Sequence, residues 1–529
     1  MEDASTLALD YPPQQLGIKQ MSTLSISTLS STLSAERRRW MALMVVCLAQ
    51  LMIVLDTTIV NVALPAIQHE LHFTQGNLTW VVNAFLISFG SFLLLAGRLG
   101  DLVGRKRVFL TGVVVITAAS VLCGIAPSEG LLIGARFLQG IGAALSSSVI
   151  LAIIVTEFSA AADRAKAMSA YVFVAVAGGS LGLLAGGALT QALSWHWIFF
   201  VNVPIGVATF LAGRTLIPDD RGAGLAGGVD WLGSLLVTVS LMTAVYAIVQ
   251  ATSHGWGSIQ VLGFGAIAAG LMAAFLTVEA RISNPIMPLR ILRLRGLVGS
   301  SAVRAFLVTG MYSTFFLGTL YLEHVLHYSA LPTGFAFLPF TVTVGMLSLG
   351  VTARLISRFG ALRVLLAGLT TMVVGLGLLT TTGLHTAFFP TIFIAFFTLG
   401  LGAGTSFTPL LTIAMADVPP HDAGLGSGIV NLSQQVGGAL GLAVLGTVAT
   451  NHSKALEAHG QSVASSLLSG YHLAFTVGAG SVAVGIIATL VVLRPHARRA
   501  AAAQAAAVPP PPLRLRDSEL EPALERRAA

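Results

Sequence analysis

The amino-acid sequence predicts an all-α integral membrane protein of about fourteen transmembrane helices, with two six-helix bundles and two further helices inserted between them. Composition is the first observation: 55% of the 529 residues are hydrophobic and 10% are charged, whereas soluble proteins carry about 25% charged residues. The second is a series of about fourteen apolar stretches of roughly 20 residues, the length that crosses a bilayer. The third is an internal repeat.

Short connections that hold most of the charge separate the apolar stretches. In chain order, the predicted spans are residues 41–65, 78–97, 106–126, 130–152, 167–190, 197–214, 230–250, 259–279, 297–322, 332–352, 363–382, 389–412, 424–449 and 471–493. Alternate connections hold nearly all of the Lys and Arg, and the remaining ones hold only Lys454. This positive-inside pattern predicts a multi-pass plasma membrane protein with cytoplasmic termini, and it explains the net charge of +7 without nucleic acid as a partner.

Two connections of related sequence carry the repeat. "GRLGDLVGRKRV" joins the second and third spans, and "ARLISRFGALRV" joins the tenth and eleventh, with five identical residues all displaced by 256 positions. Repeated halves are common in transporters, whose substrate site lies near the membrane midplane between the halves. We therefore expect a disordered cytoplasmic tail, an N-terminal six-helix bundle, two inserted helices with linkers, a C-terminal six-helix bundle and a second disordered cytoplasmic tail at residues 1–36, 37–214, 215–296, 297–495 and 496–529.

Asp56 is the only charged residue within the long apolar stretch of the first span. An ionisable side chain at membrane depth costs about 2.5–3.5 kcal/mol on insertion scales, and it usually faces an internal cavity and serves transport. Because burial and neighbouring charges change the affinity of a carboxylate for protons, Asp56 is a predicted proton-coupling residue. The alternative is a structural aspartate that caps a helix break or bonds to Thr57, Thr58 or Asn61.

Arg136 and Arg304 are the other charges well inside predicted spans. At about 1.5 Å per residue, Arg136 and Asp56 fall at similar depth in a core about 30 Å thick. We therefore expect Arg136 to face Asp56, directly or through water, and to tune its proton affinity; the alternative is an arginine that ties helices together through backbone carbonyls. Arg304 lies about seven residues into its span, so we expect it to snorkel to the inner interface, with a pairing to Glu279 as a less favoured alternative.

Five motifs, taken in order, resemble the major facilitator superfamily and specifically its branch of fourteen-helix drug:proton antiporters. They are "LDTTIVNVALP" in the first span, "GRLGDLVGRKR" after the second, "RFLQGIGAA" in the fourth, "WHWIFFVNVPIG" at the sixth and "PPHDAGLGSGIVNLSQQVGGALGLAV" at the thirteenth. The resemblance covers nearly all of residues 40–493. It implies a major facilitator fold and associates the arginine that matches Arg136 with proton transfer.

The connection after the second span has a further expected role. Its glycines allow helices to approach closely, and Asp101 is suited to accept hydrogen bonds at a helix N-terminus or to pair with a nearby arginine. The resemblance implies a cytoplasmic latch that holds the outward-facing state, formed by Gly97, Asp101, Gly104 and Arg105. The alternative for the basic residues is a role in topology alone.

The fifth span departs from the pattern of the antiporters. Leu183 stands where relatives usually have proline, and the loss of that proline removes an expected kink. Gly182, Gly186 and Gly187 remain, and they predict a helix-packing face of small residues.

Several other residues are candidates for binding. Those that are predicted to line a substrate cavity are Asn61, Phe85, Tyr312, Phe316 and Gln435, with packing or lipid contact as the alternative for each aromatic residue. His324 and His327 have a spacing that suits a metal, but no third ligand is evident, so neither a metal site nor a cofactor is expected. Cys47 and Cys123 fall within spans and are predicted packing residues.

The sequence also restricts the class of function. It has no Gly-rich phosphate loop ending in Gly-Lys-Ser or Gly-Lys-Thr, and no cluster of His, Glu or Ser at one membrane face, so neither an ATP-driven pump nor an enzyme is expected. The repeated halves and the buried acid favour alternating access over a channel. The leading hypothesis is a monomer in the lipid bilayer that exports amphipathic or lipophilic, often cationic, drugs or toxic compounds in exchange for protons. The alternatives are a dedicated exporter of one endogenous metabolite, such as an antibiotic, lipid or siderophore, and a non-transporting membrane sensor.

Overall fold

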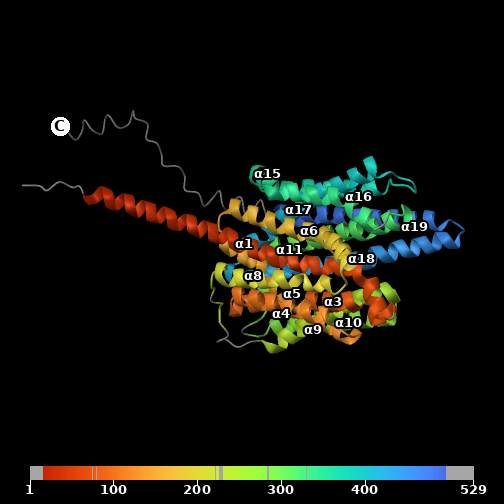
Figure 1. Ribbon diagram of the computed structural model, residues 1–529, viewed down its shortest axis with the longest axis horizontal. Coiled ribbons are helices and arrows are strands. Elements are labelled where there is room, and N and C mark those ends of the chain that lie inside the picture. The colour runs from red at the N-terminus through yellow and green to blue at the C-terminus, as the bar shows by residue number, and fades with distance from the viewer. Residues whose placement is uncertain are drawn as a thin grey trace, which may run out of the picture.

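The computed structural model describes residues 16–495, except residues 74, 79, 221, 225–229, 283–284 and 329. In these ranges the chain forms helices joined by short loops and contains no strand. Most of the helices run roughly along the long axis of the molecule (Figure 1). The predicted tail 496–529 and residues 1–15 of the other predicted tail lie outside the described residues.

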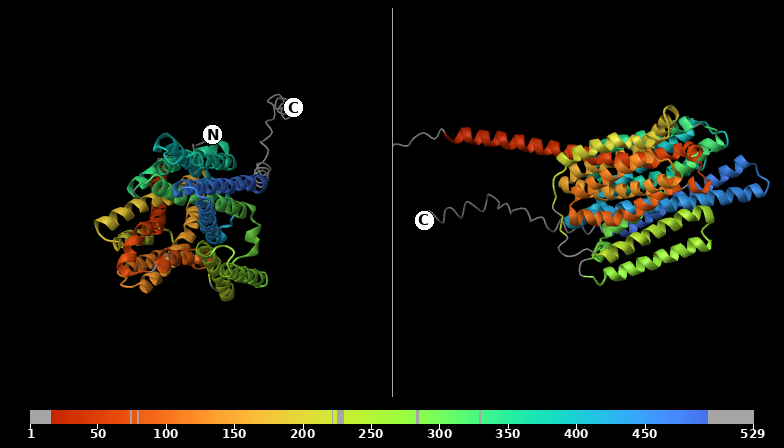
Figure 2. Two further views of the ribbon diagram at one scale, coloured as in Figure 1. Left: turned by 90° about the vertical axis from the view of Figure 1, so that its right-hand side faces the viewer. Right: turned by 60° about the horizontal axis from the view of Figure 1, so that its bottom comes forward.

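The N-terminal helices are α1 to α8, and the inserted pair is α9 and α10. Their bounds are α1 Leu16–Leu71, α2 Gln75–Leu78, α3 Trp80–Val103, α4 Arg105–Gly124, α5 Glu129–Glu157, α6 Ala161–Ala192, α7 Trp197–Phe200, α8 Asn202–Leu216, α9 Trp231–His254 and α10 Ile259–Glu279. Within this group α1 packs against α6 and α8, while α5 packs against both α3 and α4. α9 and α10 lie side by side at the edge of the bundle (Figure 2), where α9 contacts α3.

The C-terminal helices are α11 to α19, with several short 3-10 and π-helical turns between them. Their bounds are η1 Leu289–Arg293, α11 Arg295–Tyr312, η2 Ser313–Leu317, α12 Gly318–Leu320, η3 Tyr321–Val325, α13 Ala330–Ala336, α14 Leu338–Met346, η4 Leu347–Val351, α15 Thr352–Phe359, α16 Ala361–Leu379, η5 Phe388–Ile392, α17 Phe393–Ala416, η6 Pro420–Asp422, α18 Ala423–Ala458, α19 Val463–Ala488 and η7 Thr489–Leu493. The N-terminal and C-terminal helices meet where α18 contacts α3 and α5, and where α6 contacts α14 and α17.

The number of membrane-spanning helices differs slightly from the predicted fourteen. In the described ranges, 12 helices are long and apolar enough to cross a membrane, or 13 if the bent pair in α6 is one span. The span predicted at 332–352 is the one that falls short, because only Pro332–Met346 forms a shorter apolar helix. Gly350 has a positive φ of 104°, which interrupts regular helix just beyond that segment.

Residues 16–36 are helical, whereas the sequence predicts a disordered tail for residues 1–36. They form the first part of α1, which extends well beyond the bundle (Figure 1). Neither Gly nor Pro occurs between residues 18 and 64, so nothing in the sequence breaks the helix before it enters the bundle.

The expectation that α6 loses its kink without a proline is wrong. The helix bends by 42° between Ala161–Gly179 and Leu184–Ala192. Gly178 and Gly179 are followed by a serine at this bend, and Gly/Ser pairs are a known cause of sharp kinks. Glycine and serine, rather than proline, therefore account for the bend.

Gly182 and Gly186 form the small-residue face by which α6 packs on α1. A methyl group added to Gly186 would lie 2.8 Å from the carbonyl oxygen of Ile59, and one added to Gly182 would collide with Thr58. Gly187 is half-buried beside them. The predicted packing role therefore agrees with the close approach of the two helices at Gly182 and Gly186.

The two copies of the sequence repeat adopt similar turns. Gly104 precedes α4 with φ 109°, and Gly360 precedes α16 with φ 83°, conformations that favour glycine. Among the positions where the copies differ, Ser357 occupies the place that corresponds to Asp101. The Ser357 hydroxyl is exposed and donates to the Arg354 carbonyl at 2.8 Å.

Candidate functional site

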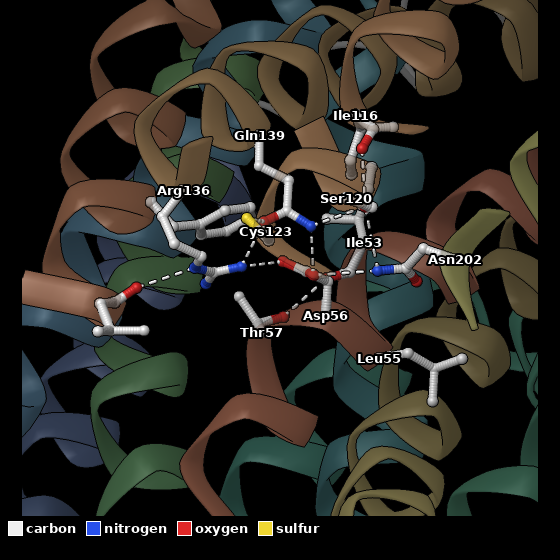
Figure 3. A network of polar contacts seen from close by, with 12 residues as sticks. Ile53, Leu55, Asp56, Thr57, Ile116, Ser120, Cys123, Arg136, Gln139 and Asn202 are labelled. Carbon is white, nitrogen blue, oxygen red and sulfur yellow. Dashed lines mark hydrogen bonds and ion pairs between the residues drawn. The ribbon is translucent and has the colours of Figure 1, made fainter. Parts of the chain in front are cut away.

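Asp56 lies near the middle of a buried polar network in the N-terminal helices (Figure 3). Its carboxylate is completely buried. It accepts hydrogen bonds from Arg136 Nη1 at 2.5 Å and Gln139 Nε2 at 2.6 Å, both on α5, and from Asn202 Nδ2 at 3.1 Å, on α8. Three helices are thus joined through one carboxylate.

Arg136 is placed as the sequence predicts, in direct contact with Asp56. Its guanidinium is 1% exposed, and its Cζ atom lies 4.6 Å from the ring centre of Phe85, a cation–π distance. The alternative role is present as well, because Nε donates to the backbone carbonyl of Val81 at 2.8 Å and so ties α5 to α3. The tuning of proton affinity stays a prediction.

Both the oxygen and the nitrogen of the Gln139 side-chain amide form hydrogen bonds within the network. Its oxygen accepts from Arg136 Nη1 at 2.7 Å, which directs its nitrogen toward Asp56 and toward Ser120 Oγ at 2.9 Å. The oxygen also lies 3.5 Å from the sulfur of Cys123, so this predicted packing residue borders the site. The arrangement orients the amide donor toward the carboxylate.

Asn202 brings α8 into the network. Its nitrogen bonds Asp56 and lies 3.4 Å from Ser120 Oγ, while its own Oδ1 is a buried acceptor without a hydrogen-bond partner in the described ranges. Thr57 and Thr58 instead donate to backbone carbonyls of their own helix.

The network suits an ionised carboxylate, because all of its partners are N–H donors. Ionised Asp56 and Arg136 form a buried pair whose desolvation is offset by mutual attraction and by the surrounding donors. A proton added to Asp56 would turn an acceptor oxygen into a donor that faces N–H groups, and it would weaken the attachment of α1 to α5. One proton can therefore change the strength of a contact between helices.

Gln139, Asn202 and Ser120 are absent from the predicted set of site residues. Gln139 lies one helical turn after Arg136, and Asn202 falls within the motif "WHWIFFVNVPIG". A polar side chain inside an otherwise apolar motif was the available signal for both. Ser120 has no such signal, because serine is common in membrane helices.

Asp101 lies near the C-terminal end of α3 and joins the N-terminal helices to the C-terminal helices there. Its buried carboxylate accepts from the backbone N–H groups of Gly424 at 2.8 Å and Leu425 at 2.9 Å, the first turn of α18. A carboxylate at a helix N-terminus satisfies free N–H groups and interacts favourably with the helix dipole. Gly97 packs against Gly424 so closely that a methyl group there would lie 3.0 Å from its carbonyl carbon.

Arg105 supports the same junction. Its guanidinium contacts Asp101 Oδ1 at 3.3 Å, donates to Thr156 Oγ1 at 2.6 Å and donates to the carbonyl of Pro420 across the junction. Both roles foreseen for Asp101, at a helix N-terminus and beside an arginine, are therefore present. The latch function itself stays a prediction.

The turn at Gly104 is held by two neighbouring aspartates. Asp220 accepts from the backbone N–H of Arg105 at 2.7 Å and so caps α4, while exposed Asp219 pairs with Lys106 at 2.8 Å. The hydrogen bond from Lys106 lowers the pKa of the Asp219 carboxyl. The turn that carries the junction is thereby fixed to the end of the N-terminal helices.

A second ionic group lies beside the junction. Buried Asp422 contacts Arg98 at 3.6 Å and Arg290 at 2.9 Å. Arg98 also donates to the carbonyl of Pro285 at 3.2 Å, in the linker that follows the inserted helices. Three parts of the chain are thus joined at this end.

The expectation for Arg304 is wrong. Its side chain is 3% exposed rather than extended to an interface, and it donates to Gln434 Oε1 on α18. Glu279 instead accepts from the backbone N–H groups of Ile286 at 3.2 Å and Met287 at 3.1 Å. Packing between α11, α17 and α18 covers Arg304, which distance along the chain alone does not reveal.

The residues that are predicted to line a substrate cavity differ in burial and in their neighbours. Phe85 is fully buried under the Arg136 guanidinium, and Phe316 is 43% exposed, whereas its neighbour Phe315 packs on other rings. Gln435 is half-buried beside Gln434. The side chains of Asn61 and Tyr312 lie outside the described residues.

Comparison with known proteins identifies a protein family that matches most of the chain. The Major Facilitator Superfamily model matches residues 46–442 and 305–524. The chain is 38% identical over 464 residues to the puromycin resistance protein pur8 of Streptomyces alboniger, covering 87% of this chain and 91% of that protein. It is 36% identical to the cephamycin export protein CmcT of Amycolatopsis lactamdurans, with 77% and 84% covered. It is 34% identical to the multidrug resistance protein Stp of Mycobacterium tuberculosis, with 80% and 78% covered.

Solved structures agree on the fold. The human organic anion transporter MFSD10 superposes with a TM-score of 0.61 at 16% identity, covering 85% of this chain and 99% of that one. The proton:xylose symporter XylE superposes with a TM-score of 0.57 at 13% identity, covering 84% and 95%. At these identities the likeness concerns the fold alone.

Proposed function

The chain belongs to the Major Facilitator Superfamily, and from that premise we propose that it is a secondary active transporter that exports amphipathic or lipophilic compounds in exchange for protons. The exchange proceeds by alternating access between the N-terminal and C-terminal helices. The substrates are drugs or toxic compounds, often cationic, and the activity confers antibiotic or multidrug resistance.

The buried Asp56–Arg136 pair carries this proposal. An ionisable pair at membrane depth is expensive and is typically retained for proton or ion movement. Here the carboxylate joins α1, α5 and α8 through three polar side chains, so its protonation changes a contact between helices rather than an isolated group. The resistance and export names of the relatives support the direction of transport and the kind of substrate.

Protonation of Asp56 is coupled to opening in the proposed cycle. With Asp56 ionised, Arg136 and the two amides hold α1 against α5 and α8. Proton uptake weakens that attachment, and the helices can then move relative to one another. Release of the proton on the other side restores the attachment and resets the transporter.

The Asp101 junction is the proposed cytoplasmic latch. It joins α3 to the N-terminus of α18 at one end of the molecule, and in the proposal this contact holds the state that is open toward the opposite side. We further propose that the protein lies in the plasma membrane as a monomer. We propose that both termini are cytoplasmic, because the basic loops lie on the same side as the latch.

A dedicated exporter of one metabolite is the second candidate. The names of two relatives, which refer to puromycin resistance and to cephamycin export, favour an antibiotic as the single substrate. The site geometry is the same in both cases, because proton coupling does not depend on the breadth of substrates.

Proton release from everted membrane vesicles tests the proposal. The vesicle interior is acidified by respiration, and the release of protons is followed with a pH-sensitive dye as lipophilic cations and antibiotics are added one at a time. We expect release with the natural chain and none with Asp56→Asn at matched expression. Glu457→Gln is the control, because this glutamate is exposed near the C-terminal end of α18.

Three outcomes separate the alternatives. Release that survives in Asp56→Asn places the proton site elsewhere and refutes the proposed role of this residue. Release with one antibiotic alone favours the dedicated exporter. No release with any compound contradicts proton-coupled export.

A further inference from the structure

Arg304 is a buried cation without an acidic partner in the described ranges of the chain. It lies on α11, and its side chain is 3% exposed. One nitrogen donates to Gln434 on α18, and the guanidinium carbon lies 5.2 Å from the ring centre of Phe407 on α17. These contacts are neutral, and none of the ion pairs in the described ranges includes Arg304.

Other donors near Arg304 are also unused. Its Nε and Nη1 atoms have no hydrogen-bond partner in the described ranges, and the same is true of the Ser300 and Ser301 hydroxyls. These serines precede Arg304 by four and three residues, a spacing that puts side chains on one face of a helix. Both serines are buried, so one face of α11 carries a group of unsatisfied donors.

The depth of this group along its helix matches that of substrate sites in repeat-built transporters. Arg304 lies nine residues after the start of α11 at Arg295, or about 14 Å along the helix, which is near the middle of a core about 30 Å thick. Phe407 adjoins Thr408, whose hydroxyl lies 3.4 Å from that of Ser169 on α6 among the N-terminal helices. Substrate sites of repeat-built transporters lie at this depth, between the two halves.

A buried guanidinium stays charged, because arginine does not lose its proton in proteins. An uncompensated buried charge is destabilising, and unsatisfied buried donors are rare in native proteins. The planar fork of arginine matches the oxygens of a carboxylate, sulfonate or phosphate, to which it donates in pairs. An anionic group would satisfy both the charge and the free donors.

We propose that Arg304, with Ser300 and Ser301, binds the anionic group of a transported amphipathic compound. This inference rests on the proposed function and deepens it, because it adds acidic and zwitterionic compounds to the substrate class. The Phe407 ring beside the guanidinium supplies apolar contact for the remainder of such a compound. An anionic lipid headgroup has the same chemistry and is the other source of the ligand.

Binding of a matched pair of probes tests the proposal. The purified full chain, in neutral detergent, is titrated with 1-pyrenebutyrate and with 1-pyrenebutyramide, which differ only in the charged group, and energy transfer from tryptophan to pyrene reports binding. We expect the carboxylate to bind about ten- to hundredfold more tightly than the amide, as for hydrogen bonds to a charged group. No preference in the natural chain overturns the proposal.

Variants of Arg304 test whether this residue causes the preference for the carboxylate over the amide. In Arg304→Gln the preference should fall to about one while the affinity for the amide is kept, which also reports an intact fold. Arg304→Lys keeps the charge but loses the planar fork, so a reduced preference is expected. Arg354→Gln, which removes an exposed arginine of the repeat, should leave the preference unchanged. An unchanged preference in either Arg304 variant overturns the proposal, and Arg304→Lys decides the matter if Arg304→Gln does not fold.

Added lipid distinguishes the two sources of the anion. Displacement of 1-pyrenebutyrate by phosphatidylglycerol, but not by phosphatidylcholine, supports the anion site with a lipid headgroup as its occupant. No displacement by either lipid supports a free compound. Since the binding measurement needs no proton gradient, a failure of proton coupling appears in the vesicle experiment and not here.

Discussion

Removal of either charge of the Asp56–Arg136 pair is expected to destabilise the protein strongly. Both side chains are essentially fully buried, and the pair is in contact at 2.5 Å. Breaking such a pair from one side leaves an uncompensated buried charge and costs about 3–5 kcal/mol. We therefore expect this loss in the free energy of unfolding for Asp56→Asn and for Arg136→Met.

The double variant tests whether the two side chains act together. With both charges removed, no uncompensated ion remains, so the combined loss should be smaller than the sum of the single losses by about 3 kcal/mol. The free energy of unfolding is measured in mixed micelles from tryptophan fluorescence as the fraction of sodium dodecyl sulfate rises. Arg354→Met, at an exposed arginine, is the control and should change this energy by no more than about 0.5 kcal/mol.

Additive losses would refute this reasoning. If the double variant loses the sum of the single losses to within about 0.5 kcal/mol, the two side chains are energetically independent. The buried pair would then not be a unit that a proton can switch.

Three further predictions follow from the described contacts. Gln139→Leu removes a donor to the buried carboxylate and should cost about 1–3 kcal/mol of unfolding free energy in the same micelle assay, together with a loss of proton release in vesicles. Asp101→Asn should weaken the junction by about 1.5–3 kcal/mol and broaden the distances between spin labels on α4 and η6, whereas Ser357→Ala, its counterpart in the repeat, should leave those distances unchanged. Gly182→Val should lower the free energy of unfolding by about 1–3 kcal/mol through collision with α1, while Gly270→Ala on α10, where an added methyl group would meet no atom within 4 Å, should be tolerated.

Sequence patterns predicted the features that depend on hydrophobicity and depth. The apolar stretches coincide with helices, and counting along two helices from the membrane edge was enough to place Arg136 opposite Asp56. In each case the cause is local in the chain or common to all membrane helices, so a single sequence contains it.

The missed features depend on which helices are neighbours. Asn202 meets Asp56 across 146 positions of the chain, and the membership of α8 in that group of helices is set by packing. The prediction for Arg304 was wrong for the same reason. Its distance from the end of the span suggested that the side chain reaches the membrane interface, but neighbouring helices cover it. The bend of α6 shows a further limit, because glycine and serine can supply what a missing proline does not.

The contact of Asp101 with α18 has a consequence for the resting population of the transporter. The carboxylate stabilises closure at one end, through two hydrogen bonds to a helix N-terminus, and Ser357, at the same end of the other half, adds no comparable contact. A contribution of about 3 kcal/mol, as for hydrogen bonds to a charged group, favours the closed conformer at that end by roughly a hundredfold. Without substrate or gradient, nearly all molecules should therefore wait in the same conformation, and the rate of turnover should be governed by the step that leaves it.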